Sequence, residues 1–173
     1  MKTMIAAASL ALLAAGGARA EVVEARPNGF EVRHEVVVNA PAERVWGTLV
    51  QPAKWWSSAH TWSGSAANLS LGAASGGCFY ERLPNGGSVL HMTTVYAAPG
   101  QRLVLTGGLG PLQASGASGA LVFALAEKDG QTTVTVTYDV GGYVRGGLDK
   151  LAAPVDAVIG QQVAGLKAAA EGK

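Results

Sequence analysis

Apolar residues recur at helical spacing near the end of the chain, over residues 148–170. Placed on a helix, they form one stripe, while Asp149, Asp156 and Lys167 lie off it. The stripe consists of Leu148, Leu151, Val155, Val158, Ile159, Val163 and Leu166. An apolar stripe has to be buried against another element. We therefore expect a long C-terminal helix that packs on a sheet.

Four residues interrupt this helical pattern. Gly160 and Gly165 each weaken a helix by about 1 kcal/mol relative to alanine, so either packing compensates or the sheet approaches closely there. Pro154 either begins the main helix or kinks a longer helix that starts near Leu148. Gln162 falls within the apolar face, where it needs a partner, a water or a cavity unless it lies at the wet edge.

Upstream, apolar and polar residues alternate with the period of two that is typical of strands. The clearest run is 133–140, where four apolar residues share one face and Thr133 and Asp139 lie on the other. His34 interrupts the apolar face of the first run, which favours a hydrogen-bonded structural histidine over a ligand. The expected strands are 30–39, 68–73, 78–83, 88–97, 102–106, 119–127 and 133–140.

Two short helices are expected after the first strand. Asn39 can cap a helix, Pro41 is tolerated in a first turn, and Glu43 suits its positive end. Pro52 ends this helix and opens a second, brief one. The predicted fold class is α+β: a curved antiparallel sheet of about seven strands that grips the long C-terminal helix.

The N-terminal segment has the pattern of a secretory signal peptide. Lys2 precedes an apolar run, and Ala18-Arg19-Ala20 has the small-x-small form that signal peptidase cleaves. We therefore predict a signal peptide at 1–20, a polar leader at 21–29 and one domain at 30–171. The expected location is outside the cytoplasm, in a bacterial periplasm.

Composition narrows the classes of function. The 173 residues contain 13 Lys and Arg against 12 Asp and Glu, with no basic cluster for nucleic acid. The one cysteine, Cys78, has no partner for an internal disulfide and is expected to pack within a strand. The three histidines lack metal-ligand spacing. Neither a metal nor a cofactor is predicted.

The Asn-Gly turn after residue 83 predicts a hairpin and assigns the faces of its two strands. In a regular hairpin Phe79, Glu81, Leu90 and Met92 share the inner, more apolar face, together with Leu83 and Tyr96. A buried carboxylate must be paired, protonated or wet, so Glu81 is either a polar cavity residue or a rim residue near the strand end. His91 falls on the opposite face, and only a bulge would bring it to Glu81.

Tryptophans cluster beside a small-residue loop. Trp55, Trp56 and Trp62 lie within eight residues, and such a group is typical either of the mouth of an apolar pocket or of core packing. For the adjacent pair, we expect one of Trp55 and Trp56 in the core and the other at the pocket rim.

Several motifs resemble those of the START-like helix-grip superfamily, in particular its polyketide-cyclase and Hsp90-activator-like branch. Residues 39–46 and 52–56 resemble its opening A-P-x-x-x-V-W … W pattern. Gly76-Gly77-Cys78-Phe79 resembles its Gly-Gly-x-Phe strand entry, and residues 99–103 resemble its Pro-x-x-Arg-Leu turn. The similarity runs from about residue 30 to residue 171. Such motifs specify the fold well and the reaction poorly.

The resemblance implies a cavity between sheet and C-terminal helix that holds a small hydrophobic molecule. Its expected lining residues are Trp55 or Trp56, Phe79, Glu81, Met92 and the inner face of the C-terminal helix, with Gln162. Two other functions remain open. One is a cavity enzyme of cyclase or hydrolase type with Glu81 as acid–base; the other is a partner-binding domain that uses the Gly107–Ser118 loop or the tryptophans. Hsp90 is cytosolic, so the export signal argues against it as a partner.

Overall fold

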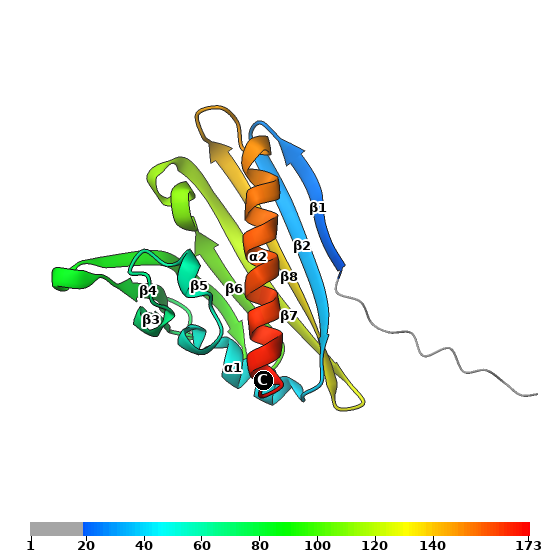
Figure 1. The fold of residues 1–173 in the computed structure, drawn as a ribbon. Helices are drawn as coiled ribbons and strands as arrows, with labels where there is room; N and C mark the ends of the chain where they lie inside the picture. The colour runs from blue at the N-terminus through cyan, green and yellow to red at the C-terminus, as the bar shows by residue number, and fades with distance from the viewer. Residues whose placement is uncertain (1–18) are drawn as a thin grey trace, which may run out of the picture.

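The computed structural model describes residues 19–173 and has the expected α+β fold (Figure 1). One antiparallel sheet of eight strands has the order β1-β2-β8-β7-β6-β5-β4-β3. The strands are β1 (Arg19–Arg26), β2 (Gly29–Val38), β3 (Leu69–Leu71), β4 (Cys78–Arg82), β5 (Ser88–Ala98), β6 (Arg102–Gly107), β7 (Gly116–Lys128) and β8 (Gln131–Tyr143). The helix α1 (Ala42–Leu49) follows β2, and α2 (Asp149–Ala170) ends the fold.

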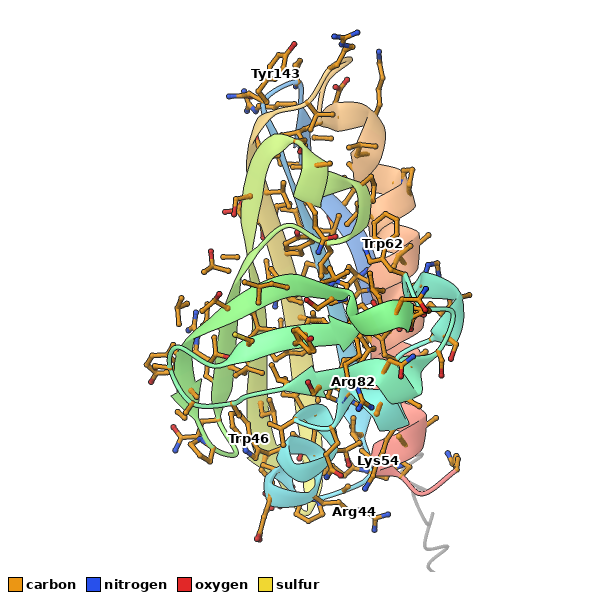
Figure 2. The ribbon with its side chains drawn as sticks, turned by 90° about the vertical axis from the view of Figure 1, so that its left-hand side faces the viewer. Arg44, Trp46, Lys54, Trp62, Arg82 and Tyr143 are labelled. Carbon is orange, nitrogen blue, oxygen red and sulfur yellow. The ribbon has the colours of Figure 1, made fainter. Side chains whose placement is uncertain are left out.

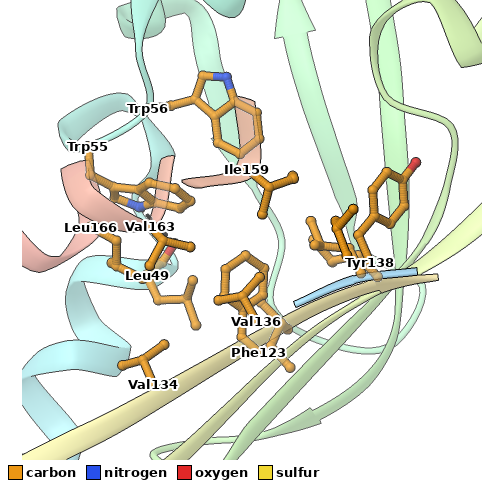
Figure 3. Packing of buried hydrophobic residues seen from close by; sticks show 14 of the residues in the cluster. Leu49, Trp55, Trp56, Phe123, Val134, Val136, Tyr138, Ile159, Val163 and Leu166 are labelled. Carbon is orange, nitrogen blue, oxygen red and sulfur yellow. Dashed lines mark hydrogen bonds between the residues drawn. The ribbon is translucent and has the colours of Figure 1, made fainter. Parts of the chain in front are cut away.

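The C-terminal helix lies across the concave face of the sheet, as its apolar stripe predicts (Figure 1). Pro154 is inside α2 rather than at its start, so the longer of the two expected helices is the one that forms. Figure 3 shows Ile159, Val163 and Leu166 of α2 packed with side chains from α1, β7 and β8. The core therefore fills one end of the space between helix and sheet.

The two glycines of α2 mark points of close approach. A Cβ added at Gly160 would lie 2.8 Å from the ring of His34, and one added at Gly165 would lie 2.3 Å from the carbonyl oxygen of Trp55. His34 is buried on β2 with its Nε2 2.7 Å from a carboxylate oxygen of Asp156. His34 therefore lies at the contact between sheet and helix, but neither atom of this close pair forms a hydrogen bond of regular geometry, so the expected hydrogen bond is not seen.

The N-terminal prediction needs a correction. Residues 21–26, expected in a polar leader, belong to β1, which pairs antiparallel with β2. An edge strand is held by backbone pairing on one side and tolerates charged side chains, so its polar sequence is compatible with a strand. The predicted signal peptide, 1–20, lies outside the described residues except for its last two, which begin β1.

The hairpin of β4 and β5 departs from the expected register. The outer half follows the prediction, with Phe79 opposite Met92. Nearer the turn, Tyr80 lies opposite Leu90 instead, and His91 is the extra residue of a β-bulge. Leu90, expected inside, is therefore exposed, and His91, expected outside, is buried. Tyr96, also expected inside, is exposed next to a second irregularity, between Thr94 and Tyr96 in the pairing of β5 with β6.

Cys78, expected to be packed, is also exposed.

In the described part of the chain, no helix is long and apolar enough to cross a membrane.

Candidate functional site

An apolar cavity of about 350 Å³ lies beside the packed core. The first half of α2 forms one wall with Leu151, Val155 and Ile159, and the sheet forms the opposite wall with Phe79 and Tyr138. The lining is mostly hydrocarbon and aromatic, which is typical of small-molecule sites. The helix and the sheet thus enclose the hollow that the fold predicts.

Two connecting segments cover the cavity. Residues 59–62 come from the loop after α1, and residues 109–112 come from the connection between β6 and β7. They meet where the indole N–H of Trp62 donates to the amide oxygen of Gln113 at 3.0 Å. Trp62, labelled in Figure 2, nevertheless leaves 59% of its surface exposed. The cover is therefore a junction of two loops and not a packed core.

The buried carboxylate of Glu81 binds one of these two covering segments, the loop after α1. Glu81 is fully buried, and its oxygens accept hydrogen bonds from the backbone N–H groups of Trp62 and Ser63. His91 contributes a third contact, with its Nε2 2.9 Å from the Glu81 carboxylate. The bulge in β5 is what places this imidazole on the inner side with Glu81. These contacts satisfy a charge that would otherwise be costly to bury.

The environment favours the charged form of Glu81 and the neutral form of His91. Burial raises the pKa of Glu81, but hydrogen bonds from Ser63, Trp62 and His91 outweigh it, so the pKa lies below its ordinary value. Burial lowers the pKa of His91, and the neighbouring Glu81 offsets only part of that effect. At neutral pH the pair is therefore a carboxylate beside a neutral imidazole.

Tyr138 is the deepest polar group of the lining. Its hydroxyl donates to the carbonyl oxygen of Gly107 at 3.4 Å and accepts from the N–H of Leu109 at 3.2 Å. Burial raises its pKa to about 12, with the Leu109 hydrogen bond acting in the opposite direction. Tyr138 therefore stays a neutral phenol that fastens the 109–112 segment to β8.

Of the six residues predicted to bind a ligand, the cavity is lined by two, Trp56 and Phe79, whose rings meet edge to face at 5.2 Å. Trp55 is the core member of the tryptophan pair, and its indole N–H donates to the carbonyl of Leu49 (Figure 3). Met92 is buried away from the cavity.

The two remaining candidates are buried outside the cavity lining. Glu81 contacts His91, and it is His91 that faces the cavity. Gln162 accepts a hydrogen bond from the N–H of Ser57 at 2.8 Å, and its Nε2 has no hydrogen-bond partner among the described residues. Gln162 therefore links α2 to the loop after α1, which covers the cavity.

Sequence reasoning missed His91 as a cavity residue. The regular hairpin pattern placed His91 on the outer face, because a β-bulge cannot be recognised from the alternation of apolar and polar residues. Trp62 was grouped with its neighbours only as a possible rim residue. Alternation put Tyr138 on the apolar face of the run 133–140, and in the structure that face is buried.

A curved sheet that grips a C-terminal helix around an apolar cavity defines a helix-grip domain. The sequence model of the family described as polyketide cyclase/dehydrase and lipid transport matches residues 29–171. The chain belongs to this family and, through it, to the START-like superfamily that its motifs resemble. No match was found among the curated proteins.

Solved structures of low sequence identity share the fold. CalU16 from Micromonospora echinospora has a TM-score of 0.61 at 12% identity, covering 94% of this chain and 79% of its own. A conserved protein of unknown function from Enterococcus faecalis, EF2215, has a TM-score of 0.59 at 16% identity, covering 89% of this chain and 78% of its own. The protein CV1439 from Chromobacterium violaceum has a TM-score of 0.59 at 18% identity, covering 86% of this chain and 100% of its own. At these identities the likeness extends to the fold alone.

Proposed function

We propose that this protein binds a small, uncharged, mainly apolar molecule in the cavity between α2 and the sheet. The observation that carries the proposal is the cavity itself: about 350 Å³ of space lined by α2, Phe79 and Tyr138. Ligand sites in proteins range from about 300 to 1,000 Å³, so the expected ligand is at the small end. The description of the family, which includes lipid transport, supports the same function.

The charges around the cavity favour an uncharged ligand. Among the described residues that line it, there is no lysine or arginine to pair with a carboxylate or phosphate. Its polar side chains already bond within the protein: Thr61 donates to Ser58, and His60 contacts Gln161. An anion in such a site would lose its hydration without a counter-charge, which is strongly unfavourable.

We also propose that binding takes place in a bacterial periplasm. The support is the signal-peptide pattern of residues 1–20, with its apolar run and the Ala18-Arg19-Ala20 cleavage motif. N-terminal sequencing of the protein recovered from a periplasmic extract tests this proposal. A chain that keeps Met1 and stays with the cytoplasmic fraction would contradict it.

A matched pair of fluorescent dyes tests the binding function. Phenylnaphthylamine and its sulfonated analogue, anilinonaphthalene sulfonate, share an aromatic skeleton and differ by one negative charge. We expect the neutral dye to bind at least about tenfold more tightly, because the cavity offers apolar contacts and no cation. The measurement is a titration of dye emission, excited directly so that protein tryptophans do not contribute.

Two variants of α2 locate the dye. Val158 lines the cavity, whereas the adjacent Ala157 is exposed. Val158→Trp fills part of the space and is expected to weaken binding of the neutral dye by about tenfold. Ala157→Trp adds the same side chain on the solvent side and should leave binding unchanged. Equal affinity of both variants and the parent protein would place the dye elsewhere and contradict the proposed site.

A further inference from the structure

The carboxylate of Glu81 determines which nitrogen of His91 carries the proton. Glu81 is ionised and accepts from two backbone N–H groups, so its contact with His91 at 2.9 Å requires a donor at Nε2. The imidazole is neutral, so its other nitrogen, Nδ1, bears a lone pair. The buried pair thus presents one hydrogen-bond acceptor in a lining residue of an otherwise apolar cavity.

The present partner of this lone pair holds it only weakly. The amide nitrogen of Gln113 lies 3.2 Å from Nδ1 and also donates to the carbonyl of Leu90 at 3.3 Å. Both distances are at the long end for such bonds. Gln113 is only partly buried, and it directly follows Leu112, which lines the cavity. A ligand in the cavity is therefore in position to compete with the Gln113 amide.

We propose that His91 Nδ1 accepts a hydrogen bond from a ligand hydroxyl in place of Gln113, so that the cavity selects neutral alcohols or phenols over the corresponding ethers. This inference rests on the proposed binding function. The two hydroxyl groups of the lining give no comparable preference. The Tyr138 hydroxyl already donates and accepts, and the Thr61 hydroxyl donates within its own loop.

The test compares para-phenylphenol with its methyl ether, in which a methyl group replaces the hydroxyl proton, so that only the phenol can donate a hydrogen bond. Calorimetric titration at neutral pH is expected to show about three- to tenfold tighter binding of the phenol, the worth of one hydrogen bond. Equal affinities would overturn the inference and leave the binding function intact. Absence of binding by both would overturn the binding function as well.

Two variants assign the preference to the lone pair. Gln113→Ala removes the competing amide and is expected to increase the phenol-to-ether affinity ratio by about threefold. His91→Phe keeps a ring of similar size without an acceptor, and the ratio should fall to about one. The ratio cancels any general change in cavity shape, because the ether reports that change alone. A ratio unaffected by Gln113→Ala would overturn the inference even if His91→Phe fails to fold.

Acidification provides an independent measurement on the unmodified protein. Protonation at Nδ1 turns the acceptor into a donor, so the phenol-to-ether ratio is expected to fall toward one below the pKa of His91. Glu81 is the carboxylate that contacts His91, and His60 and Tyr138 are the other titratable groups of the lining. Tyr138 and the phenol both stay neutral on the acidic side. A ratio that is constant with pH would contradict the role of His91.

Discussion

Gly165→Ala is expected to lower the free energy of unfolding by about 2–4 kcal/mol, although alanine is the better helix former. A Cβ at this position would lie 2.3 Å from the carbonyl oxygen of Trp55, which is a backbone atom and not a movable side-chain end. Either α2 must shift away from the loop or the loop must move. Because Trp55 is buried in the core, both responses disrupt packing. Urea unfolding monitored by tryptophan fluorescence measures the change.

Gly47→Ala in α1 is the matched control. It makes the same substitution in a helix, but outside the chain neighbours and the backbone of α1 no atom lies within 4 Å of the added Cβ. We expect this variant to gain about 0.5–1 kcal/mol from the better helix propensity of alanine. The opposite signs of the two changes are the test. If Gly165→Ala stabilises the protein as Gly47→Ala does, the close contact between α2 and the Trp55 carbonyl is wrong.

The sequence predicted the elements that obey a simple period. The stripe of α2 and the alternation of β8 are fixed by which residues must be buried, and both are confirmed. The glycines of α2 left open whether packing compensates or the sheet approaches closely, and their partners, His34 of the sheet and the Trp55 carbonyl of a loop, come from distant parts of the chain. Local patterns therefore reveal that a surface is covered without revealing what covers it.

The first strand was missed for a related reason. Residues 21–26 lack the alternation of apolar and polar residues that predicts a strand, and β1 is held by backbone pairing to β2. Backbone hydrogen bonds are available to any sequence, so an edge strand leaves a weak signal in side-chain pattern. A strand count of about seven and the observed eight differ by this one element.

The sequence predicted the hairpin that contributes to the site, but the predicted register of its two strands was wrong near the turn. The hairpin signal correctly placed Glu81 inside, but the loop at the turn is one residue shorter than expected, and the extra residue of the bulge, His91, compensates. One residue of slip reverses the face of a side chain, so the Glu81–His91 pair could not be found from alternation. A cavity is also invisible in sequence, because it depends on which side chains leave space unfilled.

Glu81→Gln is expected to lower the free energy of unfolding at neutral pH by about 2–4 kcal/mol. The carboxylate accepts from three donors: the N–H groups of Trp62 and Ser63, and Nε2 of His91. Glutamine keeps the shape but offers one acceptor oxygen and an NH₂ group that faces donors. At least one buried group then loses its partner. Glu43→Gln, at an exposed site on α1, is the control and should change stability by no more than about 0.5 kcal/mol.

The pH dependence separates the charge of Glu81 from its shape. Its pKa in the folded protein lies below the ordinary 4.5, so the ionised form contributes stability above pH 4.5 that is lost as the pH falls through the folded-state value. The gap between the parent protein and Glu81→Gln should therefore narrow below pH 4.5. Glu171, whose pKa is lowered to about 2 by the Asn39 N–H and two lysines, adds acid sensitivity to both proteins equally. A gap that stays constant from pH 7 to the acid limit would show that shape, and not the buried charge, holds the cover of the cavity in place.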